Sequence, residues 1–239
     1  ECYTDASDNK ITTEYLYICD LWDLSVSIPG ISEIFGGTTI AFFNAISNNR
    51  YSLPVQSISY KEVPNDNNKY LVGASIYIYK SIPVTTSSTL EVIDSIYTLK
   101  TPGITMINFD NSEISYQNGK YKFLYDKSFF EFQVNITQNT IKGEPIEIIE
   151  NKGVSSARIY AVNNSTPVFE SVNALASEVA YQGFEDHEDQ SWSSTTGCSI
   201  EQNDAKSGEK YLKINPYNST SLNKIINYDV TSQGYKASV

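Results

Sequence analysis

The stretch IKGEPIEIIENKGVSSARIY, residues Ile141 to Tyr160, predicts a β-hairpin. Apolar and polar side chains alternate in Pro145-Ile146-Glu147-Ile148, which is the period of a strand with one buried face. Asn151-Lys152-Gly153 then provides residues that favour a turn, and a second strand-like run follows. Because a two-stranded hairpin cannot bury its apolar face alone, this one is expected to pack beside further strands.

Strand-like runs separated by turns extend along most of the chain. They occur at Ile11 to Ile18, Val55 to Glu62, Tyr70 to Lys80, Leu90 to Leu99, Lys120 to Tyr125, Phe129 to Thr137, Glu144 to Glu150 and Ser155 to Val162. Turn residues stand between them at Asn48-Asn49, Pro64 to Asn68, Pro102-Gly103, Asn118-Gly119 and Lys142-Gly143. The sequence therefore predicts a mostly β fold, in which residues from about Ile11 to Val162 form consecutive antiparallel strands.

Two segments carry further expectations about local structure. In the run from Tyr70 to Lys80, the alternation puts Tyr70, Val72, Ala74, Ile76 and Ile78 on one face. Leu71, Ser75, Tyr77 and Tyr79 then form the other, aromatic face, which is expected to point outward. Between Pro167 and Tyr181, apolar residues recur at helical spacing, so a short surface helix is predicted there.

Length, composition and charge limit the functional classes. A chain of 239 residues can bury a substantial core, as one large β domain or as one domain plus part of another. The formal net charge is −11, and Arg50 and Arg158 are the only arginines, so no basic stripe exists to neutralise phosphates. No apolar run reaches the roughly 18 residues of a bilayer-spanning helix. We therefore expect neither nucleic-acid binding nor a membrane span.

The chain begins at Glu1 in the middle of a pattern and stops at Val239 in strand-like sequence, so we expect it to be a processed or partial piece of something longer. Cys2 and Cys19 could close a small loop in an oxidising compartment, and reduced, packed thiols are the other reading. If Cys2 and Cys19 form a disulfide, Cys198 is left without a partner cysteine.

Catalytic machinery is hard to find in the sequence. The single histidine, His187, lies in the acidic run Glu185 to Asp189, and no G-x-S-x-G, Walker or C-x-x-C motif is present. Consecutive side chains in that run point in alternate directions and cannot all reach one ion, which favours a hydrated charged loop. We expect no enzymatic activity.

The region from Ile11 to Phe184 resembles the RHS or YD-repeat-like proteins of Bacteroidota. The first motif that carries the resemblance is Asn48 to Val55, and the match is most specific at Gly143 to Ala174. There Gly143-Glu144-Pro145 corresponds to the family's GNP, Asn151-Lys152-Gly153 to its DG turn, and Thr166-Pro167-Val168 through Asn173-Ala174 to its exit. The resemblance implies hairpins stacked edge to edge as a non-catalytic scaffold, exported by type IX secretion or otherwise secreted to the extracellular face of the outer membrane. An unrelated antiparallel sandwich is the alternative.

A second resemblance starts at Tyr181-Gln182-Gly183-Phe184-Glu185-Asp186. With Trp192 and the stretch Asp204 to Ile214, this segment resembles the opening of a carbohydrate-binding-module-like jelly roll. The resemblance implies a structural Ca²⁺ held by Glu185, with Asp186 as a second candidate ligand; solvated loop acids are the alternative. The stretch from Gly183 to Val239 is too short for a complete jelly roll, so a partial β-sandwich is expected.

These readings predict three segments: residues 1–174 as the antiparallel hairpin-repeat sheet, 175–182 as a connector, and 183–239 as the incomplete jelly-roll-like module. Two functions follow. The first is a structural and interaction segment whose partner is the rest of its polypeptide or a neighbour in a surface assembly. The second is a carbohydrate-binding or adhesin module, in which glycans are the partner. Its exposed aromatic residues would be found among Tyr77, Tyr79, Tyr116, Tyr121 and Trp192.

Overall fold

The fold is known from a computed structural model. It describes residues 2–5, 9–23, 27–30, 34–106, 109–161 and 165–179, together with short strand segments at 193–194, 198–202, 210–214 and 222–223. The chain divides into two compact units. The first comprises Glu1–Thr137, Ile141–Gly143 and Ile149–Lys152; the second comprises Gln138–Thr140, Glu144–Ile148 and Gly153–Val239.

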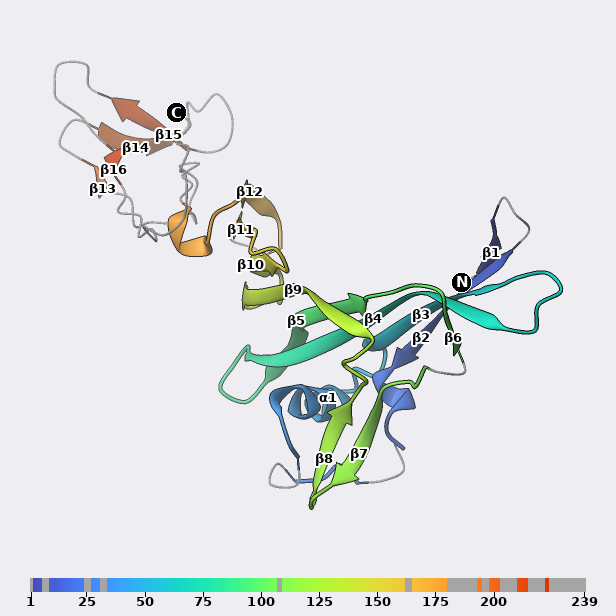
Figure 1. Cartoon of the computed structure of the whole chain (residues 1–239). Helices are drawn as coiled ribbons and strands as arrows, with labels where there is room; N and C mark the ends of the chain where they lie inside the picture. Colours follow the sequence, from blue (N-terminus) through green and yellow to red (C-terminus); the bar gives the residue numbers. More distant parts are fainter. Residues whose placement is uncertain are drawn as a thin grey trace. The chain divides into compact units, whose positions relative to one another are not determined.

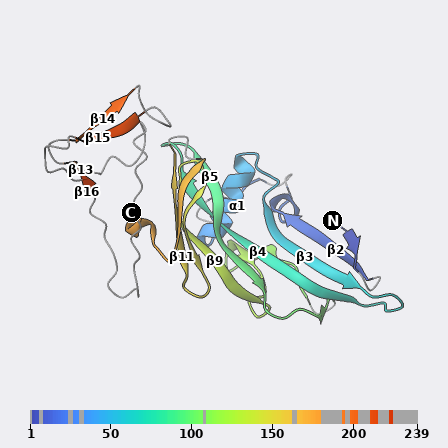
Figure 2. The same cartoon turned by 90° about the horizontal axis from the view of Figure 1, so that it is seen from above.

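The first unit is built on an antiparallel sheet whose strands follow the order of the chain. Its order is β1-β2-β3-β4-β5-β9, and the short β6 pairs with β4. Figure 2 shows β2 to β5 running side by side. The strands are β1 Cys2–Thr4, β2 Lys10–Tyr17, β3 Pro54–Glu62, β4 Lys69–Pro83, β5 Thr89–Leu99, β6 Ile104–Thr105 and β9 Phe130–Asn139, the last two residues of which belong to the second unit.

A helix and a separate hairpin lie on one side of this sheet (Figure 1). They are α1 Gly37–Ser47 and the hairpin of β7 Glu113–Gln117 and β8 Lys120–Leu124. Phe42 of α1 packs edge-on against Phe123 of β8, with ring centroids 4.9 Å apart. The hydroxyl of Thr39 accepts a hydrogen bond from the backbone N–H of Phe123 at 3.0 Å. The core therefore lies around α1, between the sheet and the hairpin.

The eight predicted strand runs are confirmed, each within a few residues of its predicted ends, as β2, β3, β4, β5, β8, β9, β10 and β11. The mostly β fold class is confirmed with them. The Asn118-Gly119 turn joins β7 to β8 with φ of 53° and 79°, the left-handed pair that a tight two-residue hairpin turn requires. Gly153, at φ 75°, lies in the turn between β10 and β11, so the hairpin predicted for Ile141 to Tyr160 is present.

The expectation of consecutive strands is wrong at α1. Its residues GTTIAFFNAIS carry apolar side chains on nearly every side, and Ala41, Phe42, Phe43, Ala45 and Ile46 are all buried. A helix covered on all sides has no amphipathic period, so the sequence pattern could not reveal it. The predicted Asn48-Asn49 turn is the end of this helix, where Arg50 N donates to Ala45 O at 2.8 Å.

The expected faces of β4 are right in the middle of the strand and wrong at its ends. Ala74 and Ile76 are buried as predicted, but Leu71 and Tyr79 are buried as well, with exposed fractions of 0% and 4%. Register shifts in the pairing of β4 with β3 and with β5 interrupt the alternation on either side of the central residues. As a result, the Tyr79 ring packs toward Phe42 of the helix, and its hydroxyl donates to Pro54 O at 2.9 Å.

The second unit contains β11 Ser155–Tyr160, β12 Pro167–Val172 and most of β10 Pro145–Glu150, whose last two residues belong to the first unit. The predicted helix in Pro167 to Tyr181 is wrong, because β12 pairs antiparallel with β11 and the described residues after it, up to 179, contain only a 3-10 turn at Ala176–Glu178. The apolar residues at helical spacing do not form one buried face, since Val172 is 68% exposed.

Two short antiparallel pairs follow in the second unit. They are β13 Ser193–Ser194 with β16 Leu222–Asn223, and β14 Cys198–Gln202 with β15 Lys210–Ile214. The jelly-roll-like assignment and the connector at 175–182 stay predictions, since part of that stretch lies outside the described residues.

Candidate functional site

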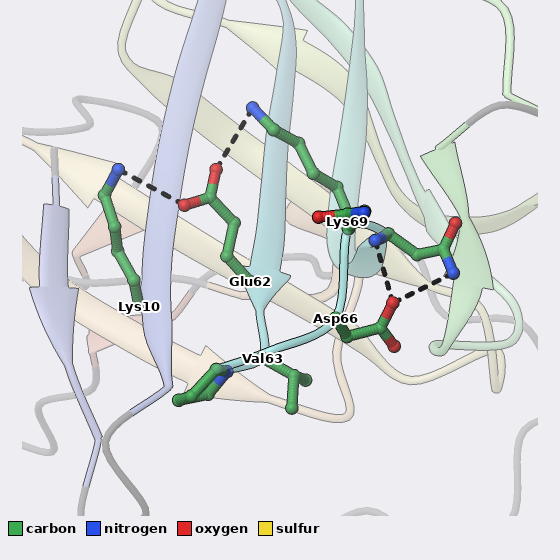
Figure 3. A pocket seen from close by; sticks show the side chains of 8 residues that line it. Lys10, Glu62, Val63, Asp66 and Lys69 are labelled. Atoms are coloured by element: carbon green, nitrogen blue, oxygen red, sulfur yellow. Dashed lines mark hydrogen bonds and ion pairs between the residues drawn. The ribbon is translucent and has the colours of Figure 1, made fainter.

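A polar hollow lies at the turn between β3 and β4, and strand pairing brings its charged residues together. Lys10 of β2 is paired directly with Glu62 of β3, and Glu62 is paired directly with Lys69 of β4. Residues directly opposite one another in antiparallel strands point to the same face. The row therefore places one carboxylate between two ammonium groups (Figure 3).

The hollow has a volume of about 320 Å³. Lys10 Nζ lies 3.3 Å from Glu62 Oε2, and Lys69 Nζ lies 3.2 Å from Glu62 Oε1, so each carboxylate oxygen faces its own ammonium group. The lining residues are Lys10, Glu62, Val63, Pro64, Asp66, Asn67, Asn68 and Lys69.

Asp66 holds the turn in shape. Its Oδ1 accepts hydrogen bonds from the backbone N–H and the side-chain amide of Asn68, at 2.9 and 3.0 Å. Its Oδ2 accepts a hydrogen bond from the Tyr70 hydroxyl at 2.7 Å. Asn65 adopts φ 66°, a left-handed conformation that asparagine tolerates better than most residues. One carboxylate thus fixes both the turn and the start of β4.

The contacts in the hollow favour the charged forms of its acids and of Lys69. Hydrogen bonds from Lys69 and Lys10 lower the pKa of Glu62 below its ordinary value. The Tyr70 hydroxyl, followed by the Asn68 backbone N–H, lowers the pKa of Asp66 in the same way. The pKa of Lys69 is raised, first by the Tyr60 side chain and then by Glu62. The side chains of Glu62, Asp66 and Lys69 are therefore ionised near neutral pH.

A second hollow, of about 270 Å³, lies at the start of α1. The helix begins after Gly36, at φ 86°, with no side-chain cap and no acidic residue in its first turn. Lys122 and Lys127 line the hollow and lie over aromatic rings, 5.3 Å from the Phe35 centroid and 5.9 Å from the Tyr125 centroid. Burial raises the pKa of Tyr125 to about 12.

The predicted calcium ligands Glu185 and Asp186, as well as His187 and Trp192, lie outside the described residues. The calcium site therefore stays a prediction. Within the part of the chain that the structure describes, no three histidine, cysteine, aspartate or glutamate side chains lie together as a metal site. Over the same ranges, no helix has the length and hydropathy that crossing a bilayer requires.

Of the tyrosines predicted as sugar-stacking platforms, Tyr116 is the most accessible, at 60% exposed. Tyr121 packs edge-on against Trp22 at 5.0 Å, and Tyr77 is half-buried with its hydroxyl 3.5 Å from that of Ser57. The expectation that Tyr79 is exposed is wrong, because its ring lies in the core.

Three features were missed in the sequence. Tyr15 and Tyr17 on β2 are 42% and 36% exposed, and their rings stack with centroids 6.3 Å apart. The order Tyr15-Leu16-Tyr17 in a predicted strand was the signal for that pair, since it places both rings on one face. The residues Pro64 to Asn68 predict a turn, but they do not predict the hollow that the turn lines. The Lys10, Glu62 and Lys69 row depends on strand register, which the sequence does not encode locally.

Of the two readings for the first two cysteines, a disulfide and reduced thiols, the structure has reduced thiols. Cys2 is exposed and Cys19 is partly buried, and both are free thiols.

No family model matches the sequence, and neither a curated protein nor a solved structure matches it.

Proposed function

We propose that this chain is a non-catalytic structural and interaction segment of a larger secreted or cell-surface protein, in which it serves as a β scaffold. The observation that carries the proposal is the order of the sheet. From β1 to β5 each strand pairs with its neighbour in sequence, and β9 joins next after the inserted hairpin. A sheet of this kind is extended by adding hairpins along one direction, which suits a scaffold made of successive hairpins.

The resemblance to RHS or YD-repeat-like proteins supports a partner and a location for this scaffold. Its partner is the rest of its own polypeptide or a neighbouring protein in a surface assembly, and its location is outside the cell or on the extracellular face of the outer membrane. The acidic surface, with a formal net charge of −11, suits a chain that stays soluble and does not bind nucleic acid.

Labelling of intact cells that produce the protein tests this proposal. An antibody against the chain should label unpermeabilised cells or detect the protein in the culture fluid. Lysine cross-linking on those cells should join Lys100 or Lys120 to sequence outside these 239 residues or to a neighbouring protein. Detection only in the cytosol after lysis, without such cross-links, would overturn the proposal.

Carbohydrate binding is the second candidate function, and exposed aromatic rings favour it. The stacked pair Tyr15 and Tyr17, together with Tyr116, presents aromatic surface to solvent, and sugar rings pack their C–H faces on such surfaces. A glycan array probed with the labelled chain tests this function. Binding that disappears in the Tyr15→Ala/Tyr17→Ala or Tyr116→Ala variant supports it, and no binding to any glycan overturns it.

A further inference from the structure

We propose that the hollow at the β3–β4 turn binds one unit of a neutral saccharide. This inference rests on the second candidate function and goes beyond it by naming a site that contains none of the exposed tyrosines. The lysines on either side of the hollow are accessible, with side chains 54% exposed at Lys10 and 47% exposed at Lys69. A ligand can therefore reach the polar groups without any rearrangement of the sheet.

The charges in the hollow favour a neutral ligand. Among its eight lining residues are two lysines and two acids, so the formal charges cancel. A metal cation would meet the ammonium groups of Lys10 and Lys69 beside the Glu62 carboxylate, which repel it. A phosphate or sulfate would have to compete with Glu62 for the same two ammonium groups. A molecule without net charge avoids both penalties.

The hydrogen-bonding groups favour a polyhydroxyl compound in particular. Ammonium groups only donate, carboxylates only accept, and the amides of Asn67 and Asn68 do both. A sugar hydroxyl is both donor and acceptor, so neighbouring hydroxyls on one ring can use groups of each kind at once. Val63 and Pro64 are the apolar residues that line the hollow, and the C–H face of a sugar ring can pack on them.

The hollow is also preorganised for ligand binding. The hydrogen bonds of Asp66 to Asn68 and Tyr70 hold the turn in place, which reduces the entropy cost of binding. Asn67 is exposed, and across the described residues nothing hydrogen-bonds its side-chain amide. This amide is therefore available to a ligand, and its removal should leave the turn intact.

The test uses the full chain and an array of neutral oligosaccharides, with sulfated and uronic-acid-containing glycans on the same array. Asn67→Ala and Lys69→Met alter the hollow, and Asn111→Ala and Lys120→Met are matched controls at exposed positions elsewhere. We expect a neutral glycan to bind, with affinity about tenfold weaker in each hollow variant, the effect of one lost hydrogen bond to a charged or amide group. The controls should bind like the parent chain, and all four variants should melt near its temperature.

Three outcomes would overturn the proposal, and they separate it from the second candidate function. Glycan binding that survives Asn67→Ala and Lys69→Met but is lost in Tyr15→Ala/Tyr17→Ala keeps carbohydrate binding and removes this site. Preference for sulfated or uronic-acid glycans, with loss in Lys69→Met, makes the hollow an anion site. Binding to no glycan at all overturns both.

Discussion

Replacing Arg50 with methionine should destabilise the first unit far more than its position near the surface suggests. The Glu91 side chain has an exposed fraction of 0%, and Arg50 Nη1 lies 3.1 Å from its Oε2. The Arg50→Met substitution leaves this carboxylate buried without a cation. Its other oxygen still accepts a hydrogen bond from the Thr89 hydroxyl at 3.0 Å.

The size of the effect follows from burial. Removing one partner of a buried ion pair costs roughly 3–5 kcal/mol of unfolding free energy. The Arg50 side chain is 33% exposed, which weakens the pair, so we expect a loss of about 3 kcal/mol. Arg158→Met is the matched control, since Arg158 and Glu170 are 2.8 Å apart but 32% and 54% exposed. That exposed pair should contribute less than about 1 kcal/mol.

Urea unfolding followed by far-ultraviolet circular dichroism measures both losses. The double variant Arg50→Met/Glu91→Gln should be more stable than Arg50→Met alone, because glutamine removes the unpaired charge and can still accept from Thr89. Equal losses in the two arginine variants, or a double variant less stable than Arg50→Met, would refute this reasoning.

Three further predictions concern other parts of the first unit. Gly143→Ala should lower the unfolding free energy by about 1–3 kcal/mol, because a Cβ at φ 91° would meet two side-chain carbons of β5 at 2.9 Å. Gly119 has φ 79° but open space around it, so Gly119→Ala should lower the unfolding free energy by less in the same urea assay. In an ultraviolet pH titration, Tyr125→Phe should remove a phenol that ionises near pH 12. The lowered pKa of Glu62 adds stability above the ordinary carboxyl pKa and loses it as pH falls through the folded value, so Glu62→Gln should flatten the acid limb of stability against pH.

The sequence predicted the strands well because period-2 alternation and turn residues are local signals. It failed where neighbours in space decide the outcome. At α1, burial on all sides removes the helical period, and in β4 register shifts bury Leu71 and Tyr79, which strict alternation places outside. Beyond β11, helical spacing misled the interpretation because pairing with β11 holds Pro167–Val172 as a strand.

The candidate site, too, is predictable from the sequence only where its signal is local. The turn at Pro64 to Asn68 is readable from its residues, but the meeting of Lys10 with Glu62 is a product of long-range pairing. Strands far apart in sequence are brought into register by their packed faces, so no short window contains this information. The stacked Tyr15 and Tyr17 were within reach of the alternation rule.

The chain-order sheet also sets an expected folding sequence. β3, β4 and β5 are joined by short connections at 63–68 and 84–88, whereas β2 is separated from β3 by residues 18–53 and β5 from β9 by residues 100–129. Closing a long loop costs more entropy than closing a short one, and distant pairings slow folding. The three central strands should therefore gain amide protection first in pulse-labelled hydrogen exchange, and β2 and β9 should dock later, once α1 and the β7–β8 hairpin have begun to cover the sheet.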